Sequence, residues 1–547
     1  MNASDISFCF VIASYNNEKN ITKNLNSIIQ QTYTNWRAIY INDCSTDKTA
    51  ELFHTILEEN NIHDKFIYIE NEQQLHQSYG KYTAYQLVND LEVVCILDGD
   101  DWLADDNVLA TLKEYYTKDY RVITSNYNIH KNGDIVSSRI ASKYTPDELK
   151  NIRMMDKWLF KHLKTGYGIL FKSISEEYLK RNDKWLTMVT DVAEMTCVTE
   201  FSNANVLCVD DIFYTYNYDN SILYPNSYYN SKDAIERKLT HEHIKQLPPC
   251  KYSLPHLYII NLLEEKTKKT HMMKQLETIQ SPYTFIEAIR GHAKDSLYEN
   301  YLLDFESTVY PKNKYCLYKK HITPGSLGLL QSIFKTLSLF VESDLEHILI
   351  LEDDVFTLKK FHPFLFINKK LLKDKDLIYL GCHSSTDLIY KSIVNNKDVF
   401  IDVKTYKKLI YGTYSIILSK KIARYILNCG LESIVKLNLS WDLFLNHIRD
   451  NTDHTTFLYF KELFIPDVMK DGIQPQRSME FYKKNNMNLD NYVYVPEPEP
   501  LPEPIPEPLP EPVPVPILHR PILSIFKPVL PKSRPVFQLK SFQFKLF

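Results

Sequence analysis

The sequence VVCILDGDDW, residues 93–102, places five apolar residues directly before a cluster of three carboxylates. The apolar run is rich in β-branched side chains, which predicts a strand buried on both faces of a parallel sheet. Carboxylates this close together repel one another and are costly to bury unless a cation lies among them. Hard divalent ions such as Mg²⁺ and Mn²⁺ prefer oxygen ligands and are often bound by one or two carboxylates plus substrate phosphates. Because α/β proteins place ligands at the carboxyl ends of parallel strands, the stretch predicts a metal-assisted phosphate site. The alternative is a solvated turn, in which Asp and Gly are common.

Strands and helices alternate around this stretch. Apolar runs at 7–13, 37–41 and 66–69 predict strands, and the patterns at 21–29 and 78–89 predict helices. Such an order predicts an α/β domain with a mostly parallel sheet and helices on its faces. The chain has no Gly-x-Gly-x-x-Gly motif, so the carboxylate cluster is the candidate site for a phosphate.

Composition narrows the class of protein. A chain of 547 residues suggests about three structural units. The formal net charge of -4 gives no general basic character, so nucleic acid is not expected as a partner. The nine cysteines include no Cys-x-x-Cys pair, which predicts reduced thiols rather than disulfides or a zinc site. No apolar run has the roughly 20 residues needed to span a bilayer, and no secretory leader is evident. We therefore expect a cytoplasmic protein. Its amino-acid composition has a bias typical of an AT-rich genome such as that of a large DNA virus.

Short motifs in the first 225 residues follow an order typical of one enzyme family. They are VIASYN (11–16), NDCSTDKT (42–49), LDGDD (97–101), GYG (166–168), TD (190–191) and YTYNYDNS (214–221). With these motifs, residues 1–225 resemble the GT-A domain of glycosyltransferase family 2. The resemblance implies a Rossmann-like fold and an inverting transferase that uses a nucleoside-diphosphate sugar, usually UDP-linked, with Mn²⁺ or Mg²⁺.

The resemblance also implies roles for individual residues. Tyr15 and Asp43 would bind the nucleotide, with Asp43 at the uracil, and Asp98 would lie on the ribose side. Asp100 would bind the metal that bridges the diphosphate. Asp191 stands where the family has its general base, which must reach the acceptor hydroxyl. The alternative for Asp191 is an exposed acid on an amphipathic helix.

Three positions depart from the family pattern. Ala13 replaces the usual Pro after the first strand, and Thr190 replaces the Glu of the Glu-Asp pair. The family's Arg before the third helix is absent, and Lys81 is the nearest cation.

A second α/β region begins near residue 255, after a segment (226–254) that we expect to be a linker with one helix. Apolar runs at 257–260, 348–351 and 377–381 predict strands, and the second of them ends in Glu-Asp-Asp at 352–354. A strand that ends in clustered acids repeats the design of the first half without repeating its sequence.

Residues 255–485 resemble glycosyltransferase family 25, which includes lipooligosaccharide and collagen galactosyltransferases. The matching motifs are INL (260–262), PGSLG (324–328), ILEDD (350–354), YLG (379–381), GTY (412–414), LS (418–419) and WD (441–442). The resemblance implies that Asp353, with Glu352 beside it, binds the UDP-sugar and that Asp354 binds the metal. It leaves the role of Asp442 open.

The second half departs further from its family. Lysines replace arginines at 266 and 268, and Arg290 replaces an acid. Ser326 replaces a Glu and Ile333 a His. Since Arg and Lys are not interchangeable where a bidentate contact is needed, a weak enzyme or a pure binding module is the alternative for this half.

The end of the chain has a different composition. Residues 496–516 alternate Pro with Glu, Leu, Ile or Val, which predicts a stiff polyproline-II spacer. Residues 517–547 are basic and rich in Phe, with no acid. Residues 517–547 are the last part of the Pro-rich tail (486–547). We expect them either to be disordered or to dock on an anionic membrane or a protein.

These observations predict two GT-A-like domains that move sugars from UDP-sugar donors to a hydroxyl of a glycan or a protein, including a collagen-like one. Two successive transfers to one acceptor would explain the pairing. A sugar-nucleotide pyrophosphorylase is a rival, but it normally has a Gly-rich phosphate loop. A catalytically weak scaffold that binds glycans or nucleotides is the other rival.

Overall fold

The computed structural model describes residues 6–466, except 119, 140–142, 157, 159, 221–231, 253, 280, 308–314, 316–319, 359–368, 383–397 and 461. The predicted spacer and basic tail lie outside the described residues.

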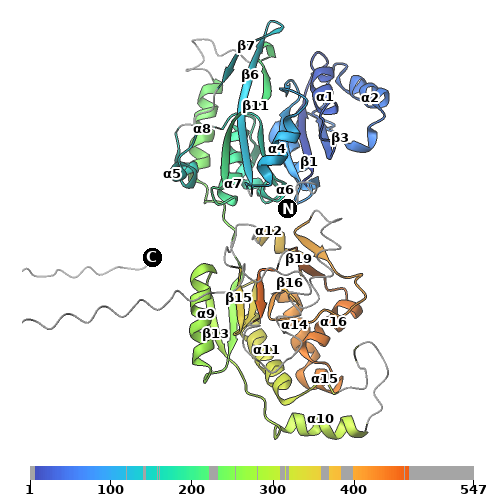
Figure 1. The fold of residues 1–547 in the computed structure, drawn as a ribbon, viewed down its shortest axis with the longest axis vertical. Helices are drawn as coiled ribbons and strands as arrows, with labels where there is room; N and C mark the ends of the chain where they lie inside the picture. The colour runs from blue at the N-terminus through green and yellow to red at the C-terminus, as the bar shows by residue number, and fades with distance from the viewer. Residues whose placement is uncertain are drawn as a thin grey trace, which may run out of the picture. The chain divides into compact units, whose positions relative to one another are not determined.

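The first half is built on a nine-stranded sheet with the order β3-β2-β1-β4-β8-β6-β11-β5, and β7 pairs with β6 (Figure 1). The strands are β1 (Phe8–Ser14), β2 (Trp36–Asn42), β3 (Phe66–Glu70), β4 (Val93–Asp98), β5 (Trp102–Leu103), β6 (Val122–Lys131), β7 (Asp134–Arg139), β8 (Lys164–Tyr167) and β11 (Val206–Asn217). Strands β3, β2, β1 and β4 run parallel, whereas β8 is antiparallel to β4 and to β6. The sheet is therefore mixed, with a parallel block where the sequence predicted one.

Helices cover this sheet and pack their buried residues against it. They include α1 (Ile21–Ile29), α2 (Thr49–Asn60), α3 (His76–Leu87), α4 (Val108–Tyr116), α6 (Gly168–Lys172) and α7 (Thr190–Phe201), with the hairpin β9 (Lys180–Arg181) and β10 (Lys184–Trp185). In α1, Ile21, Leu25 and Ile28 recur at helical spacing and are fully buried. The remaining short elements are α5 (Pro146–Lys150) and the 3₁₀ turns η2 (His63–Lys65), η3 (Ile152–Met154), η4 (Glu176–Leu179) and η5 (Tyr218–Asn220).

The parallel block brings the predicted motifs to one edge of the sheet. Ser14 at the end of β1 is in register with Asn42 at the end of β2, and Ala13 is in register with Asp98 at the end of β4. A Cβ on Gly99 would lie 2.7 Å from the Ser14 Cβ, closer than two carbons can approach without a shift. The glycine between Asp98 and Asp100 thus allows the turn to pass directly over the first strand.

Part of the segment between the two halves packs on the first half. Helix α8 (Lys232–Gln246) and the residues after it contact α7 and its surroundings. Arg153 Nη1 donates to Ile244 O (2.8 Å), and Cys250 N donates to Glu200 Oε2 (2.7 Å). Tyr178 Oη donates to Pro248 O (3.0 Å).

The second half has a seven-stranded sheet with the order β13-β12-β14-β18-β16-β19-β17 and a small sheet of β15 and β20. The strands are β12 (His256–Asn261), β13 (Tyr283–Glu287), β14 (His347–Glu352), β15 (Val355–Thr357), β16 (Leu377–Gly381), β17 (Phe400–Asp402), β18 (Ser415–Ser419), β19 (Thr456–Tyr459) and β20 (Phe464–Pro466). The helices are α9 (Lys266–Ile279), α10 (Ser296–Ser307), α11 (Pro324–Glu342), α12 (Lys369–Leu372), α14 (Lys420–Cys429), α15 (Leu431–Lys436) and α16 (Trp441–Asn451). Both halves are therefore α/β, as predicted, and each carries an acid cluster at the end of a buried strand.

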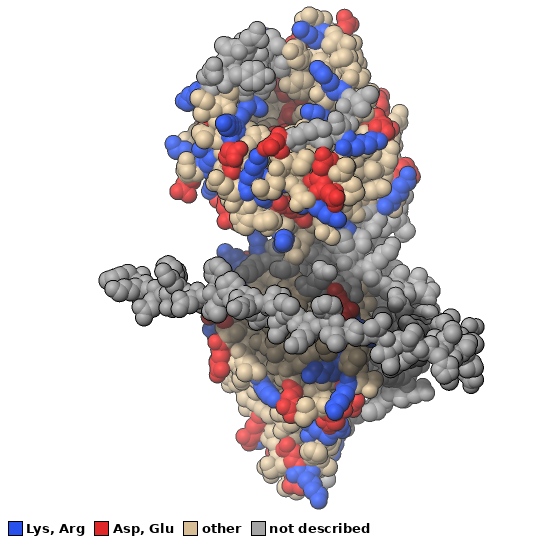
Figure 2. Space-filling model, turned by 90° about the vertical axis from the view of Figure 1, so that its left-hand side faces the viewer, with Lys and Arg blue, Asp and Glu red and all other residues tan. Residues whose placement is uncertain are grey.

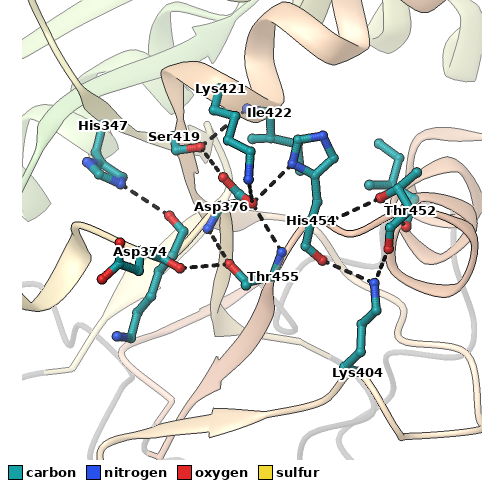
Figure 3. A network of polar contacts seen from close by, with 12 residues as sticks. His347, Asp374, Asp376, Lys404, Ser419, Lys421, Ile422, Thr452, His454 and Thr455 are labelled. Carbon is teal, nitrogen blue, oxygen red and sulfur yellow. Dashed lines mark hydrogen bonds and ion pairs between the residues drawn. The ribbon is translucent and has the colours of Figure 1, made fainter.

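A polar network closes the opposite edge of the second sheet (Figure 3). Asp376, just before β16, accepts hydrogen bonds from Ser419 Oγ (2.8 Å) and Lys421 Nζ (3.0 Å). It also accepts from Thr455 N (3.1 Å), and His454 Nδ1 lies 3.1 Å from its carboxylate. One carboxylate thereby ties the starts of β16 and β19 to the end of β18.

Candidate active sites

The three carboxylates at the end of β4 and in the turn after it differ in their burial and in their contacts. Asp101 is buried, and its two oxygens accept hydrogen bonds from Tyr214 Oη (2.7 Å) and Asn217 N (2.6 Å). Burial, together with the negative charges of Asp100 and Asp98, raises its pKa well above the usual range. Asp101 therefore fastens β11 to the turn. Asp98 and Asp100, both half-buried, are the two that could face a ligand.

Asp98 is held by groups from helix α3. Gln77 Nε2 donates to Asp98 Oδ1 (2.9 Å), and Lys81 Nζ lies 3.7 Å from the same oxygen. Burial alone would raise the pKa of Asp98, but Lys81 and the other positive groups nearby, with the hydrogen bond from Tyr214, together outweigh it, and the pKa lies below its ordinary value. Asp98 is thus ionised at neutral pH and has a counter-charge before any ligand binds.

Lys81 also faces a second, deeply buried acid. Its side chain is 3% exposed, and its Nζ lies 3.8 Å from Glu194 Oε2, whose side chain is fully buried. Burial raises the pKa of Glu194, and the charge of Lys81 opposes that effect. The Lys81 ammonium therefore lies between a carboxylate at the sheet edge and one in the core.

Asp191 lies in the first turn of α7, close to this network. Thr190 Oγ1 donates to Gln77 Oε1 (3.0 Å), so the Gln77 side chain connects Asp98 to the residue before Asp191. Lys164 Nζ lies 3.5 Å from Asp191 Oδ2, and the Asp191 side chain is 41% exposed. Burial opposes ionisation, but Lys164 and Lys81 lower the pKa of Asp191 below its ordinary value. The carboxylate is therefore ionised and reachable, as a general base must be.

The proposed nucleotide residues lie at the same edge of the sheet. Asp43 is buried, and it accepts hydrogen bonds from Asn71 Nδ2 (2.7 Å), Leu75 N (2.9 Å) and His76 N (2.9 Å). It thereby shapes the loop that leads into α3. Tyr15 is 43% exposed, directly after the end of β1, where its ring is accessible to a ligand.

The second site has a similar position but a different electrostatic balance. Asp353 Oδ1 accepts from Lys268 Nζ (3.0 Å) and Asp353 Oδ2 accepts from Asn261 Nδ2 (2.7 Å). Burial lowers the pKa of Lys268, but the charge and hydrogen bond of Asp353, together with the charges of Asp354 and Glu265, outweigh it and raise the pKa overall. Both oxygens of Asp353 are therefore bound by groups of the chain itself, while Glu352 and Asp354 lie half-buried beside it.

Arg290 differs from the family pattern and Asp442 has no assigned role, and the structure shows the contacts of both. Arg290 Nε donates to Glu264 Oε1 (2.6 Å), and both side chains are about half exposed. The positive charge of Arg290 thus has an acidic partner close by. Asp442, at the start of α16, accepts from Thr413 Oγ1 (2.6 Å), and Tyr414 O accepts from Glu352 N (3.0 Å). Asp442 therefore lies at the same edge of the sheet as the Glu352–Asp354 cluster.

Several site residues carry no motif signal. Gln77, Lys164 and Glu194 are isolated polar residues in the sequence, and only the packing of α3, β8 and α7 brings them together. A weak signal existed for Glu194, which lies one helical turn after Asp191 and therefore near the same face.

The acid clusters fit a hard cation only in part. In the described part of the chain, no group of three or more His, Cys, Asp or Glu side chains is arranged to hold a metal ion. The all-oxygen donors at Asp98–Asp100 and Glu352–Asp354 do suit Mg²⁺ or Mn²⁺ when phosphate oxygens complete the coordination. The helices among the described residues include none long and apolar enough to cross a membrane.

Comparison with known families gives two separate matches. Residues 9–179 match the model of Glycosyl transferase family 2, and residues 254–444 match that of Glycosyltransferase family 25 (LPS biosynthesis protein). Both resemblances seen in the motifs are confirmed, and the two matches fall on the two sheets.

Individual relatives match over short segments. A Glycosyltransferase 25 family member of Anopheles gambiae is 25% identical over 145 residues, which is 25% of this chain and 23% of the relative. Glycosyltransferase GlyA of Streptococcus pneumoniae serotype 4 is 26% identical over 184 residues, or 29% of this chain and 26% of the relative. The matches thus span about a quarter of these relatives.

Solved structures with a partial likeness include two glycosyltransferases. S. aureus TarS 1-349 in complex with UDP-GlcNAc is 16% identical with a TM-score of 0.30, over 41% of this chain and 64% of that one. Mannosyltransferase PcManGT from Pyrobaculum calidifontis, in complex with GDP-Man and Mn2+, is 14% identical with a TM-score of 0.29, over 44% of this chain and 65% of that one.

Proposed function

We propose that the chain is a metal-dependent, inverting glycosyltransferase that moves a sugar from a UDP-sugar to a hydroxyl of a glycan or protein acceptor. The observation that supports this most directly is the Gln77 bridge. Its side chain contacts Asp98, next to the proposed metal ligand Asp100, and Thr190, next to the proposed base Asp191. Two carboxylate functions from distant parts of the sequence thus share one edge of the sheet.

The arrangement suits inversion. Asp191 would take the proton of the acceptor hydroxyl as its oxygen forms a bond to the anomeric carbon. The bond from that carbon to UDP would break on the opposite side, and UDP would leave with the electron pair. Lys164 and Lys81 keep Asp191 ionised for this step. Tyr15, Asp43 and Asp98 would position the nucleotide.

A divalent ion would be held by Asp100 in the first half and by Asp354 in the second. When bound, Mn²⁺ or Mg²⁺ offsets the charge that develops on a departing diphosphate. Asp353 would then contact the donor of the second half. The acceptor would be a surface glycan or a protein, including a collagen-like one. The tail would contact a membrane or a partner protein.

The second half has a specific alternative role. Because Lys268 and Asn261 already bind both oxygens of Asp353, a donor or metal would compete with them for the lone pairs of that carboxylate. That observation favours a slow enzyme, or a module that only binds nucleotide or glycan, over a second enzyme of equal rate.

The experiment is a screen of UDP-sugar hydrolysis and transfer by the full chain, with Mn²⁺ and with EDTA. We expect turnover of at least one UDP-sugar that requires the metal and is lost in Asp100→Ala. Turnover that is independent of metal would remove the proposed role of Asp100. Formation of a UDP-sugar from UTP and a sugar phosphate would instead identify a pyrophosphorylase.

A further inference from the structure

A group of cations lies beside Asp191 on the side formed by β6 and β7. The segment before β8 is fixed to β6, since Leu163 N donates to Ser125 Oγ (2.9 Å) and that hydroxyl donates to His162 O (3.0 Å). Lys161 directly precedes His162, and Lys164 begins β8. This attachment holds both lysines near the base.

Arg139 joins the group from the neighbouring strand. It is the cross-strand partner of Tyr127, whose ring centroid lies 5.8 Å from that of His162. The strands β6 and β7 that carry Tyr127 and Arg139 extend side by side in Figure 1. Arg139 therefore lies opposite Tyr127, and Lys161 directly precedes the residue whose ring Tyr127 contacts.

Lys161 and Arg139 lack an acidic partner within the described residues. No described carboxylate oxygen lies within 4.0 Å of either side chain, although 4.0 Å is the limit for an ion pair. Burial and the positive charge of Lys164 lower the pKa of the half-buried Lys161, the charge of Asp191 opposes them, and the charge of Arg139 lowers the pKa further. A half-buried ammonium among other cations is electrostatically unfavourable unless an anion joins them.

Two other lysines near Asp191 have carboxylate partners of their own. Lys164 pairs with Asp191, and Lys81 lies between Asp98 and Glu194. Burial and the charge of Lys164 lower the pKa of His162 to about 3, so its ring is neutral at pH 7. Lys161 and Arg139 are therefore the cations of this group that form no ion pair with a described carboxylate.

We propose that Lys161 and Arg139 form a subsite for an anionic group of the acceptor, such as a phosphate ester, next to the hydroxyl that attacks the sugar. The proposal rests on the proposed transferase function and specifies the class of its acceptor. Lys and Arg are the usual phosphate-binding side chains. The diphosphate of the donor is the other anion to consider, but Lys161 interacts electrostatically with Asp191, the proposed base for the acceptor hydroxyl.

The first test measures binding without activity. Inorganic phosphate is titrated calorimetrically into the full chain saturated with UDP and Mn²⁺, so that the donor site is occupied. We expect binding that weakens roughly 10- to 100-fold in Lys161→Met, the range for one lost charge-assisted hydrogen bond. Lys161→Arg should keep most of it, and Lys184→Met, an exposed lysine on β10, should change nothing. Equal phosphate affinity in the native chain and Lys161→Met would overturn the proposal.

The second test measures transfer. Glycerol and glycerol 1-phosphate are compared as acceptors in the full chain, with hydrolysis of the same UDP-sugar as the reference reaction. We expect higher kcat/KM for the phosphorylated acceptor, and loss of that advantage in Lys161→Met with hydrolysis and UDP affinity unchanged. A drop in UDP affinity would instead assign Lys161 to the donor. Absence of hydrolysis in the native chain would count against the transferase function, while the phosphate titration would still decide the subsite.

Discussion

Lys81 Nζ lies 3.7 Å from Asp98 Oδ1, and the lysine side chain is 3% exposed. The carboxylate at the end of the central strand is therefore neutralised from helix α3 even when no ligand is present. The same ammonium is 3.8 Å from the fully buried Glu194. Stability and donor binding in the first half should consequently depend on the same residue.

Replacing Lys81 by Met should destabilise the first half by roughly 3–5 kcal/mol, because Glu194 would be left as a buried charge without a counter-ion. The measurement is the midpoint of chemical denaturation followed by circular dichroism. The double variant Lys81→Met/Glu194→Gln should recover part of the loss. Lys150→Met, which removes an exposed ion pair with Asp147, should cost less than about 1 kcal/mol. An equal loss in the single and double variants would show that the ion pair is not the cause.

Asp100→Ala should remove metal-dependent binding of UDP by the first half, because the diphosphate loses the ion that offsets its charge. Calorimetric titration of UDP in Mn²⁺ and in EDTA checks this. Asp106→Ala, an exposed acid just beyond the turn, is the matched control and should behave as the native chain. Unchanged Mn²⁺-dependent affinity in Asp100→Ala would contradict the metal assignment.

Asp191→Asn should lower turnover by roughly 10²–10⁴-fold, the range for loss of a general base, and leave UDP-sugar affinity nearly unchanged. Since Lys164 and Lys81 hold the pKa of Asp191 below its ordinary 3.8, the base stays ionised at mildly acidic pH. The acidic limb of kcat/KM should therefore fall below about pH 4. A limb near pH 6, or joint loss of binding and turnover, would assign Asp191 another role.

The two halves should contribute unequally. We expect Asp98→Asn in the full chain to abolish most UDP-sugar turnover, and Asp353→Asn to change it little, because Lys268 and Asn261 already occupy the Asp353 carboxylate. The check is an assay of both variants against a panel of UDP-sugars. Full loss in Asp353→Asn with full activity in Asp98→Asn would reverse the ranking. A separate donor for the second half would appear as one sugar that is lost only in Asp353→Asn.

Asp376→Asn should destabilise the second half by roughly 2–4 kcal/mol at pH 7, since one carboxylate accepts several hydrogen bonds there (Figure 3). Burial opposes ionisation of Asp376, but Lys421, Ser419 and Thr455 lower its pKa below the ordinary 3.8. Its stabilisation is thus present above that value and is lost as pH falls through the lower, folded-state pKa. Denaturation midpoints from pH 7 to pH 3 should fall less in Asp376→Asn than in the native chain. Parallel pH curves would show that Asp376 is not an acid-sensitive contact.

The sequence predicted the fold correctly where the pattern involved residues close to one another in the chain. The apolar run before Asp98 and the Gly99 turn predict a buried strand that ends at a ligand site, and the structure has the buried strand and the turn. The family resemblance also implied Asp98, Asp100 and Asp191 as site residues; Asp98 ends β4, Asp100 follows in the turn, and Asp191 lies in the first turn of α7. The distribution of surface charge also agrees with the composition. Figure 2 shows acidic and basic side chains interspersed on the face drawn, as the small net charge suggests.

The remainder depended on long-range packing. Asp101 belongs to the same motif as Asp98, but its role in holding β11 requires Tyr214 and Asn217, more than 100 residues away. Gln77 has no periodic or motif signal, and Glu194 has only the weak one of its spacing from Asp191. The engagement of Asp353 by Lys268 and Asn261 could not be predicted either, because it depends on the register of β12 against β14.

The packing of α8 and the residues after it determines where the chain can be divided. A fragment that stops at residue 225 would lose the carbonyl of Ile244, to which Arg153 donates, and the amide of Cys250, which donates to Glu200. Arg153 and Glu200 are largely buried and would face a newly opened surface beside α7, the helix that carries Asp191. A fragment that continues through Tyr252 keeps these contacts. Inactivity of the shorter fragment would therefore report damage at the cut, and only the longer one can test whether the first half transfers sugar unaided.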